Sequence, residues 1–123
     1  MTPDEFAWEV LADTVAEDGQ MLYEPLVALR TLVPETAEAE RQRIAERTLR
    51  ALHGAGLIAF VRDGDPSQQL DAEELEAAIA AAGWRTVPVG AEGTAVWLVA
   101  TDAGRRAVDE APPEVSARRE ADG

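Results

Sequence analysis

The residues of this chain best suited to binding chemistry are arginines gathered in one stretch. Residues 41–62 hold five arginines and one acid, although the 123-residue chain carries a net charge of −13. Arg43, Arg47 and Arg50 follow one another at spacings of four and three, which places them on one side of a helix. A guanidinium binds carboxylate or phosphate groups through two parallel hydrogen bonds. We therefore expect an arginine face made of Arg43, Arg47 and Arg50, together with Arg62.

The sequence leaves three interpretations of this arginine face open. It is a solvated surface whose charges pair with nearby acids, a surface that binds carboxylates of a partner protein, or a surface that binds nucleic acid. Binding to a duplex requires neutralisation of its phosphates, and a chain with 24 acids and 11 arginines is repelled unless its positive charge is concentrated. The net charge therefore disfavours DNA, and it disfavours an acidic membrane surface for the same reason.

A second candidate surface is a stripe of carboxylates near the N-terminus. Glu5, Glu9, Asp13 and Glu17 recur every four residues and so lie along one side of a helix. This acidic stripe is either a solvated face or a docking face for a basic partner or for the arginine face of a second copy. Carboxylates spread along a helix do not converge on one ion, so we expect no metal site.

The tryptophans and the single histidine give no sign of catalysis. We expect Trp8 and Trp97 to pack in the core, and Trp84, directly after a glycine, to be exposed and to anchor a partner. His53 has no nucleophile or orienting acid at a readable spacing, so we expect it to interact with the end of its helix. The chain has no cysteine and no metal-ligand, phosphate-cradling or nucleophile-elbow motif. We therefore expect neither an enzyme nor a cofactor.

The elements that position these residues are mostly helices with clear start signals. Capping boxes run from Thr2 to Glu5 and from Asp71 to Glu74, and Thr101 is an N-cap candidate. Pro25 requires that the second helix start near residue 23 or kink. The predicted helices cover about residues 2–17, 23–32, 35–53, 71–82 and 101–111, and the predicted strands cover 57–62, 84–89 and 94–100, with a hairpin loop at 90–93.

This order resembles that of a winged-helix domain. Residues 49–58, Leu-Arg-Ala-Leu-His-Gly-Ala-Gly-Leu-Ile, look like the end of a recognition helix that enters its first strand. Residues 97–105, Trp-Leu-Val-Ala-Thr-Asp-Ala-Gly-Arg, resemble the segment that leaves the wing, where the family often has Leu-Thr-x-x-Gly. The resemblance covers about residues 4–111, and it implies a third helix that reads DNA or a related surface that binds protein.

Two features differ from the family pattern. A helix of about a dozen residues lies between the first strand and the hairpin, and Glu92 stands at the wing tip, where DNA-binding wings commonly carry Lys or Arg. Fold alone does not decide function. Both differences favour a protein partner over DNA.

The sequence thus predicts one α+β, winged-helix-like domain over residues 1–111: a three-helix core, a small antiparallel sheet with an inserted helix, and a short C-terminal helix. We expect residues 112–123 to be a disordered tail. No membrane span and no secretion signal are expected, which indicates a cytoplasmic protein. The leading hypothesis is a non-catalytic module for protein binding or homodimerisation, and the alternative is a DNA-binding transcriptional regulator. A small-molecule sensor with a pocket under the inserted helix stays open.

Overall fold

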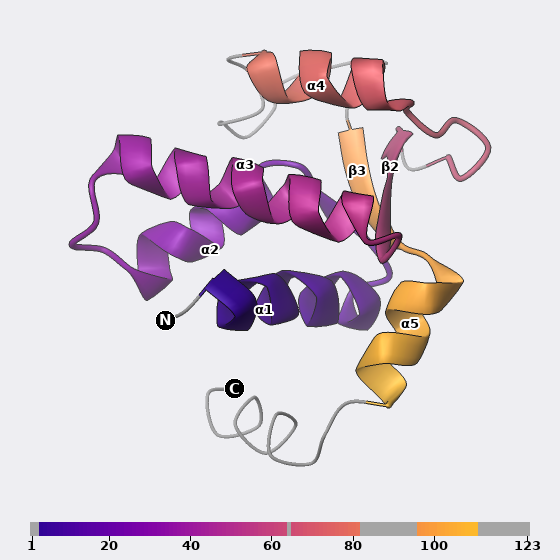
Figure 1. Ribbon diagram of the computed structural model, residues 1–123, viewed down its shortest axis with the longest axis horizontal. Coiled ribbons are helices and arrows are strands. Elements are labelled where there is room, and N and C mark those ends of the chain that lie inside the picture. Colours follow the sequence, from indigo (N-terminus) through magenta and orange to yellow (C-terminus); the bar gives the residue numbers. More distant parts are fainter. Residues whose placement is uncertain (1–2, 64, 82–95, 111–123) are drawn as a thin grey trace.

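The computed structural model of the chain describes residues 3–63, 65–81 and 96–110. Within these residues the chain forms five helices and a three-stranded antiparallel sheet, which confirms the predicted α+β class (Figure 1). The predicted strand at 84–89, the hairpin loop, Trp84 and the tail lie outside the described residues. The elements are α1 (Pro3–Ala16), β1 (Gln20–Met21), α2 (Glu24–Leu32), α3 (Glu38–Gly54), β2 (Ile58–Arg62), α4 (Ala72–Ala80), β3 (Val96–Ala100) and α5 (Asp102–Asp109).

The sheet has the strand order β1-β3-β2, with β3 in the centre. β2 and β3 pair along their whole length, with Phe60 opposite Leu98. The outer edge of β2 is also occupied, because the Leu70 amide donates to the Phe60 carbonyl at 2.9 Å and the Arg62 amide donates to the Gln68 carbonyl at 3.0 Å. The segment that leads into α4 therefore covers the edge that would otherwise offer unpaired backbone groups.

The core lies between one face of the sheet and the helices. Phe60 and Leu98 point from the sheet into this core, and each is at most 1% exposed. Amphipathic spacing explains why the helices supply the rest, since apolar residues three and four apart line the inward side of each. The core residues from the helices are Phe6, Val10 and Leu11 of α1, Leu26 and Leu29 of α2, Ala45, Leu49 and Leu52 of α3, and Leu75 and Ile79 of α4.

The capping signals identify two helix starts correctly. The carboxylate of Asp71 accepts from the Glu74 amide at 2.8 Å, and Glu74 Oε1 accepts from the Asp71 amide at 3.2 Å, which completes a capping box. The Thr101 hydroxyl accepts from the Gly104 amide at 3.0 Å, so Thr101 caps α5. Tyr23 precedes α2, which places Pro25 in the first turn, where its missing N–H needs no partner.

Two features of the fold differ from the prediction. α3 begins at Glu38 instead of residue 35, because the Thr36 amide bonds to the Val33 carbonyl at 3.1 Å and closes a turn first. The strand β1 was not predicted. It contains only two residues and forms because Gln20 and Met21 pair with β3, far along the chain.

The inserted helix α4 lies on the opposite side of α3 from α1 (Figure 1). Leu75 and Ile79 of α4, together with Leu70 before it, are buried in the core. The opposite, solvent-facing side of α4 is acidic. α4 is thus anchored by apolar side chains while its first turns bring carboxylates close to α3 and β2.

Candidate functional site: the arginine face and the inserted helix

The structure divides the predicted arginine face between three environments. Arg43, with 63% of its side chain exposed, pairs with Glu40 one turn earlier on α3 at 2.6 Å. Arg47 is exposed and makes no ion pair with another residue that the structure describes. Arg50 and Arg62 pair with carboxylates of the inserted helix. The four arginines therefore do not form one free cationic surface.

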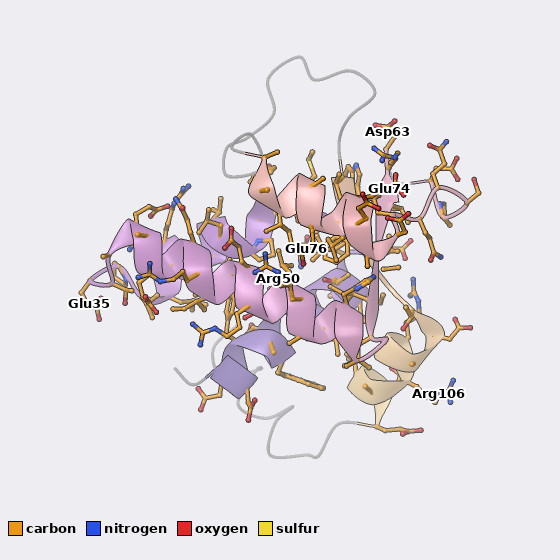
Figure 2. All side chains as sticks on the ribbon, turned by 45° about the horizontal axis from the view of Figure 1, so that its top comes forward. Glu35, Arg50, Asp63, Glu74, Glu76 and Arg106 are labelled. Carbon is orange, nitrogen blue, oxygen red and sulfur yellow. The ribbon has the colours of Figure 1, made fainter. Side chains whose placement is uncertain are left out.

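Arg50 is held in a two-point contact by Glu76. The Arg50 Nε atom donates to Glu76 Oε1 at 2.9 Å, and Nη2 donates to Oε2 at 3.0 Å. Figure 2 shows Arg50 of α3 and Glu76 of α4 facing each other between the two helices. The contact lowers the pKa of Glu76 and raises the pKa of Arg50, mainly because the hydrogen bonds between the two side chains favour the charged form of each, with a smaller contribution from the attraction of the opposite charges. The inserted helix thus supplies Arg50 with the kind of ligand that a partner carboxylate would supply.

Glu74 connects the start of α4 to the end of β2. Its Oε2 atom accepts a short hydrogen bond from Arg62 Nη2, while Oε1 accepts from the Asp71 amide at 3.2 Å. The pKa of Glu74 is lowered, first by Arg62 and then by the Asp71 amide. One carboxylate therefore closes the capping box of α4 and neutralises Arg62 at the same time.

A separate arginine cluster joins α2 to α3. Arg41, which is only 14% exposed, donates to Glu38 Oε2 at 2.8 Å and to the carbonyls of Val33 and Pro34 at 3.1 Å. Arg30 donates to the other Glu38 oxygen at 2.7 Å. These contacts lower the pKa of Glu38, with Arg30 as the larger cause and Arg41 next. Arg41 therefore has a structural role in the turn between the helices.

The acidic stripe lies on α1 and in the turn after it. Glu17 is exposed, whereas Glu5, Glu9 and Asp13 are half-buried. These three half-buried carboxylates already take part in interactions within the chain. Asp18, next to the stripe, pairs with Arg105 of α5 at 2.8 Å. The stripe is thus a partly engaged surface.

Trp8 and Trp97, which were predicted to pack in the core, are only half-buried and lie outside the central core cluster. The indole N–H of Trp8 is buried and has no acceptor among the described residues. His53 packs against Phe60, with ring centroids 5.6 Å apart.

The sequence interpretation missed Glu40, Glu74 and Glu76 as partners of the arginines. The pair Arg43–Glu40 is separated by three residues on one helix, so helical spacing was a sufficient signal for it. Glu76 is 26 residues from Arg50, and no local pattern relates the two. Only the packing of α4 against the core brings those side chains together.

Among the described residues, no group of three or more His, Asp or Glu side chains is arranged to hold a metal ion. In the same residues, every helix is too short or too polar to cross a membrane. Comparisons with protein-family models, with curated proteins and with solved structures find no match to this chain. The arginine face, the inserted helix and the acidic stripe are therefore interpreted from their own geometry.

Proposed function

We propose that this chain is a non-catalytic, winged-helix-like interaction module that binds a protein partner or a second copy of itself. The arrangement of the elements is compatible with the resemblance to winged-helix domains, since α3 leads directly into β2, β3 is antiparallel to β2, and α5 follows β3. His53 packs on an aromatic ring, which supports a structural role for the one residue best suited to acid–base chemistry.

The observation that carries the proposal is the internal pairing of the arginines. Arg43, Arg50 and Arg62 already have carboxylate ligands from Glu40, Glu76 and Glu74. A surface that binds a duplex needs its cations available to the phosphates, and the chain carries a net charge of −13. With these arginines paired and a net charge of −13, the surface as a whole attracts positive charge. The expected partner surface is therefore basic.

The acidic stripe is the candidate docking face for such a partner. Glu5, Glu9, Asp13 and Glu17 share one side of the N-terminal helical segment, and the first 29 residues contain no arginine. A basic segment that approaches this side meets several carboxylates along one line. Attraction of this kind steers association and weakens as salt increases.

Light scattering coupled to size exclusion, at low and at high salt, tests self-association. A dimer that dissociates at high salt supports contact between the acidic stripe of one copy and arginines of the other. For a monomer, the decisive measurement is fluorescence anisotropy with a labelled oligolysine peptide and a labelled DNA duplex. Binding to oligolysine supports the proposal, whereas a monomer that binds only the duplex contradicts it.

A control variant separates the acidic stripe from the general acidity of the chain. The quadruple change Glu5→Gln, Glu9→Gln, Asp13→Asn and Glu17→Gln is expected to weaken oligolysine binding. An equal change of charge elsewhere, at Glu35, Asp102, Asp109 and Glu110, is expected to weaken it less. Equal losses in the two variants would show that net charge and not the stripe determines binding.

The alternative function, a DNA-binding regulator, has one observation in its favour. Arg47 projects from α3 into solvent and makes no ion pair with another described residue. If the protein binds DNA through α3, Arg47→Gln lowers the affinity and reduces the dependence of binding on salt concentration. A duplex affinity that does not change in this variant removes the alternative.

A further inference from the structure

The inserted helix α4 supplies the carboxylate partners of two arginines, Arg50 near the end of α3 and Arg62 at the end of β2. Leu75 and Ile79 hold α4 on the core, where they are 3% and 1% exposed. From this anchored position α4 extends Glu76 to Arg50 (Figure 2), and it extends Glu74 to Arg62. Both arginines belong to elements that precede α4 in the chain, so their carboxylate partners are supplied by the insertion.

The contact between Arg50 and Glu76 has the geometry of recognition between two molecules. Two nitrogens of one guanidinium meet two oxygens of one carboxylate, at 2.9 and 3.0 Å. This two-point contact is the arrangement through which arginine selects planar carboxylates. A carboxylate of an approaching protein segment would need the same nitrogens of Arg50. Glu76 and an external acidic segment therefore compete for one position.

We propose that α4 is an internal acidic mask, whose Glu74 and Glu76 occupy the sites on Arg62 and Arg50 that otherwise bind an acidic segment of a partner protein. The inference rests on the proposed function, because it assumes that the chain binds proteins. Besides the acidic stripe, the protein would then have a second binding surface, which is positively charged and whose availability α4 controls. Arg50 and Arg62 become available to a partner when the carboxylates of α4 are displaced.

The exposure of both ion pairs makes displacement feasible. The four side chains are between 40% and 55% exposed, so solvent and salt screen their attraction. Arg47 lies one turn before Arg50 on α3 and provides a first contact for an incoming carboxylate. A segment with several carboxylates can contact Arg47 and Arg50, which share one face of α3, whereas α4 must keep its apolar side chains in the core.

An acidic protein segment fits these observations better than nucleic acid. The ligands that the structure shows on Arg43, Arg50 and Arg62 are all carboxylates. A duplex also presents a much denser row of negative charge to a chain with a net charge of −13. A short acidic segment is repelled less by the negative charge of the chain, because it contacts only the region around the arginines.

The test is the double variant Glu74→Gln/Glu76→Gln, measured by fluorescence anisotropy with a labelled oligoglutamate peptide at low salt. Glutamine at position 74 can still accept the Asp71 amide, so the capping box is retained. The control is Asp63→Asn/Glu73→Gln, which makes the same change of charge at two exposed acids without an ion pair to a described residue. Circular dichroism checks that both variants keep their helices.

We expect the double variant to bind oligoglutamate roughly threefold to thirtyfold more tightly than the control. Adding Arg50→Gln to the double variant is expected to remove the gain. The single variant Glu76→Gln, which leaves the capping box intact, is expected to show part of the gain. Equal affinities of the double variant and the control would overturn the mask, and so would a gain seen only with a labelled DNA duplex.

This outcome is distinguishable from failure of the proposed function. Self-association and oligolysine binding are measured on the unaltered protein, whereas the mask is read as a difference between two variants with the same net charge. A protein that binds oligolysine but shows no difference between the variants keeps the proposed function and loses the mask. A difference between the variants without oligolysine binding or self-association supports the mask and contradicts the basic-partner proposal.

Discussion

Gln20 and Thr14 form a buried polar contact that fixes β1 to α1. The Gln20 Nε2 atom donates to Thr14 Oγ1 at 2.8 Å and to the Val10 carbonyl at 3.2 Å. The Thr14 hydroxyl donates to the same carbonyl at 2.7 Å. Gln20 is 5% exposed and Thr14 is fully buried, so water cannot replace these bonds easily.

Thr14→Val should therefore destabilise the fold although it preserves the volume of the side chain. The change removes an acceptor of a buried amide, and we expect a loss of about 1–3 kcal/mol in the free energy of unfolding by urea. Thr14→Ser keeps the hydroxyl and serves as the control, with a smaller expected loss. A valine variant as stable as the unaltered protein would show that Gln20 finds another partner.

Gly104 of α5 lies against the backbone of Leu57, the residue before β2. A Cβ atom there would collide with the Leu57 carbonyl oxygen and lie 3.2 Å from Leu11 Cδ1. We expect Gly104→Ala to cost about 1–3 kcal/mol in unfolding free energy, because α5 must move away from the sheet. Gly54→Ala is the control, since a Cβ at Gly54 meets nothing within 4 Å. That variant is expected to be neutral or slightly more stable, and equal losses at both glycines would contradict the close-packing argument.

Arg41 and Arg43, two residues apart on α3, should differ in their effect on stability. Arg41 binds Glu38 and two backbone carbonyls and is 14% exposed, whereas Arg43 binds Glu40 among the described residues and is 63% exposed. We expect Arg41→Gln to lower the free energy of unfolding by about 1–3 kcal/mol. Arg43→Gln is expected to lower it by less than about 1 kcal/mol. Thermal and urea unfolding of the two variants measure the difference, and a reversed order would refute the structural role of Arg41.

Low pH should weaken the contribution of Glu38 to the stability of the fold. Its pKa lies below the ordinary value of 4.5 in the folded protein, so the unfolded chain binds the proton more readily. The stabilisation is fully present above pH 4.5 and is lost as the pH falls through the lower folded pKa. We therefore expect the difference in urea midpoint between the protein and Glu38→Gln to shrink in this range. The control is Glu35→Gln, which changes an exposed glutamate before the same helix. The prediction would be contradicted if the difference in urea midpoint between the protein and Glu38→Gln stayed constant as the pH falls.

The sequence by itself determined the helices and most of their limits. The α+β class, the capping box from Asp71 to Glu74 and the cap at Thr101 follow from local chemistry, because a cap and an amphipathic period depend on residues a few positions apart. The clustering of arginines in and after α3 could also be recognised from the sequence. The pair of Arg43 with Glu40 lies within the same local range.

Tertiary structure alone decided which of these charges are available. The strand β1 exists only because Gln20 and Met21 pair with Leu98 and Trp97, and a two-residue strand has no periodic pattern of its own. Glu76 reaches Arg50 only because Leu75 and Ile79 bury the other side of α4 in the core. Contacts between residues distant in sequence depend on packing, and local spacing contains no information about them. For this reason the arginine face was visible in the sequence, while the pairing of Arg50 and Arg62 with the inserted helix was not.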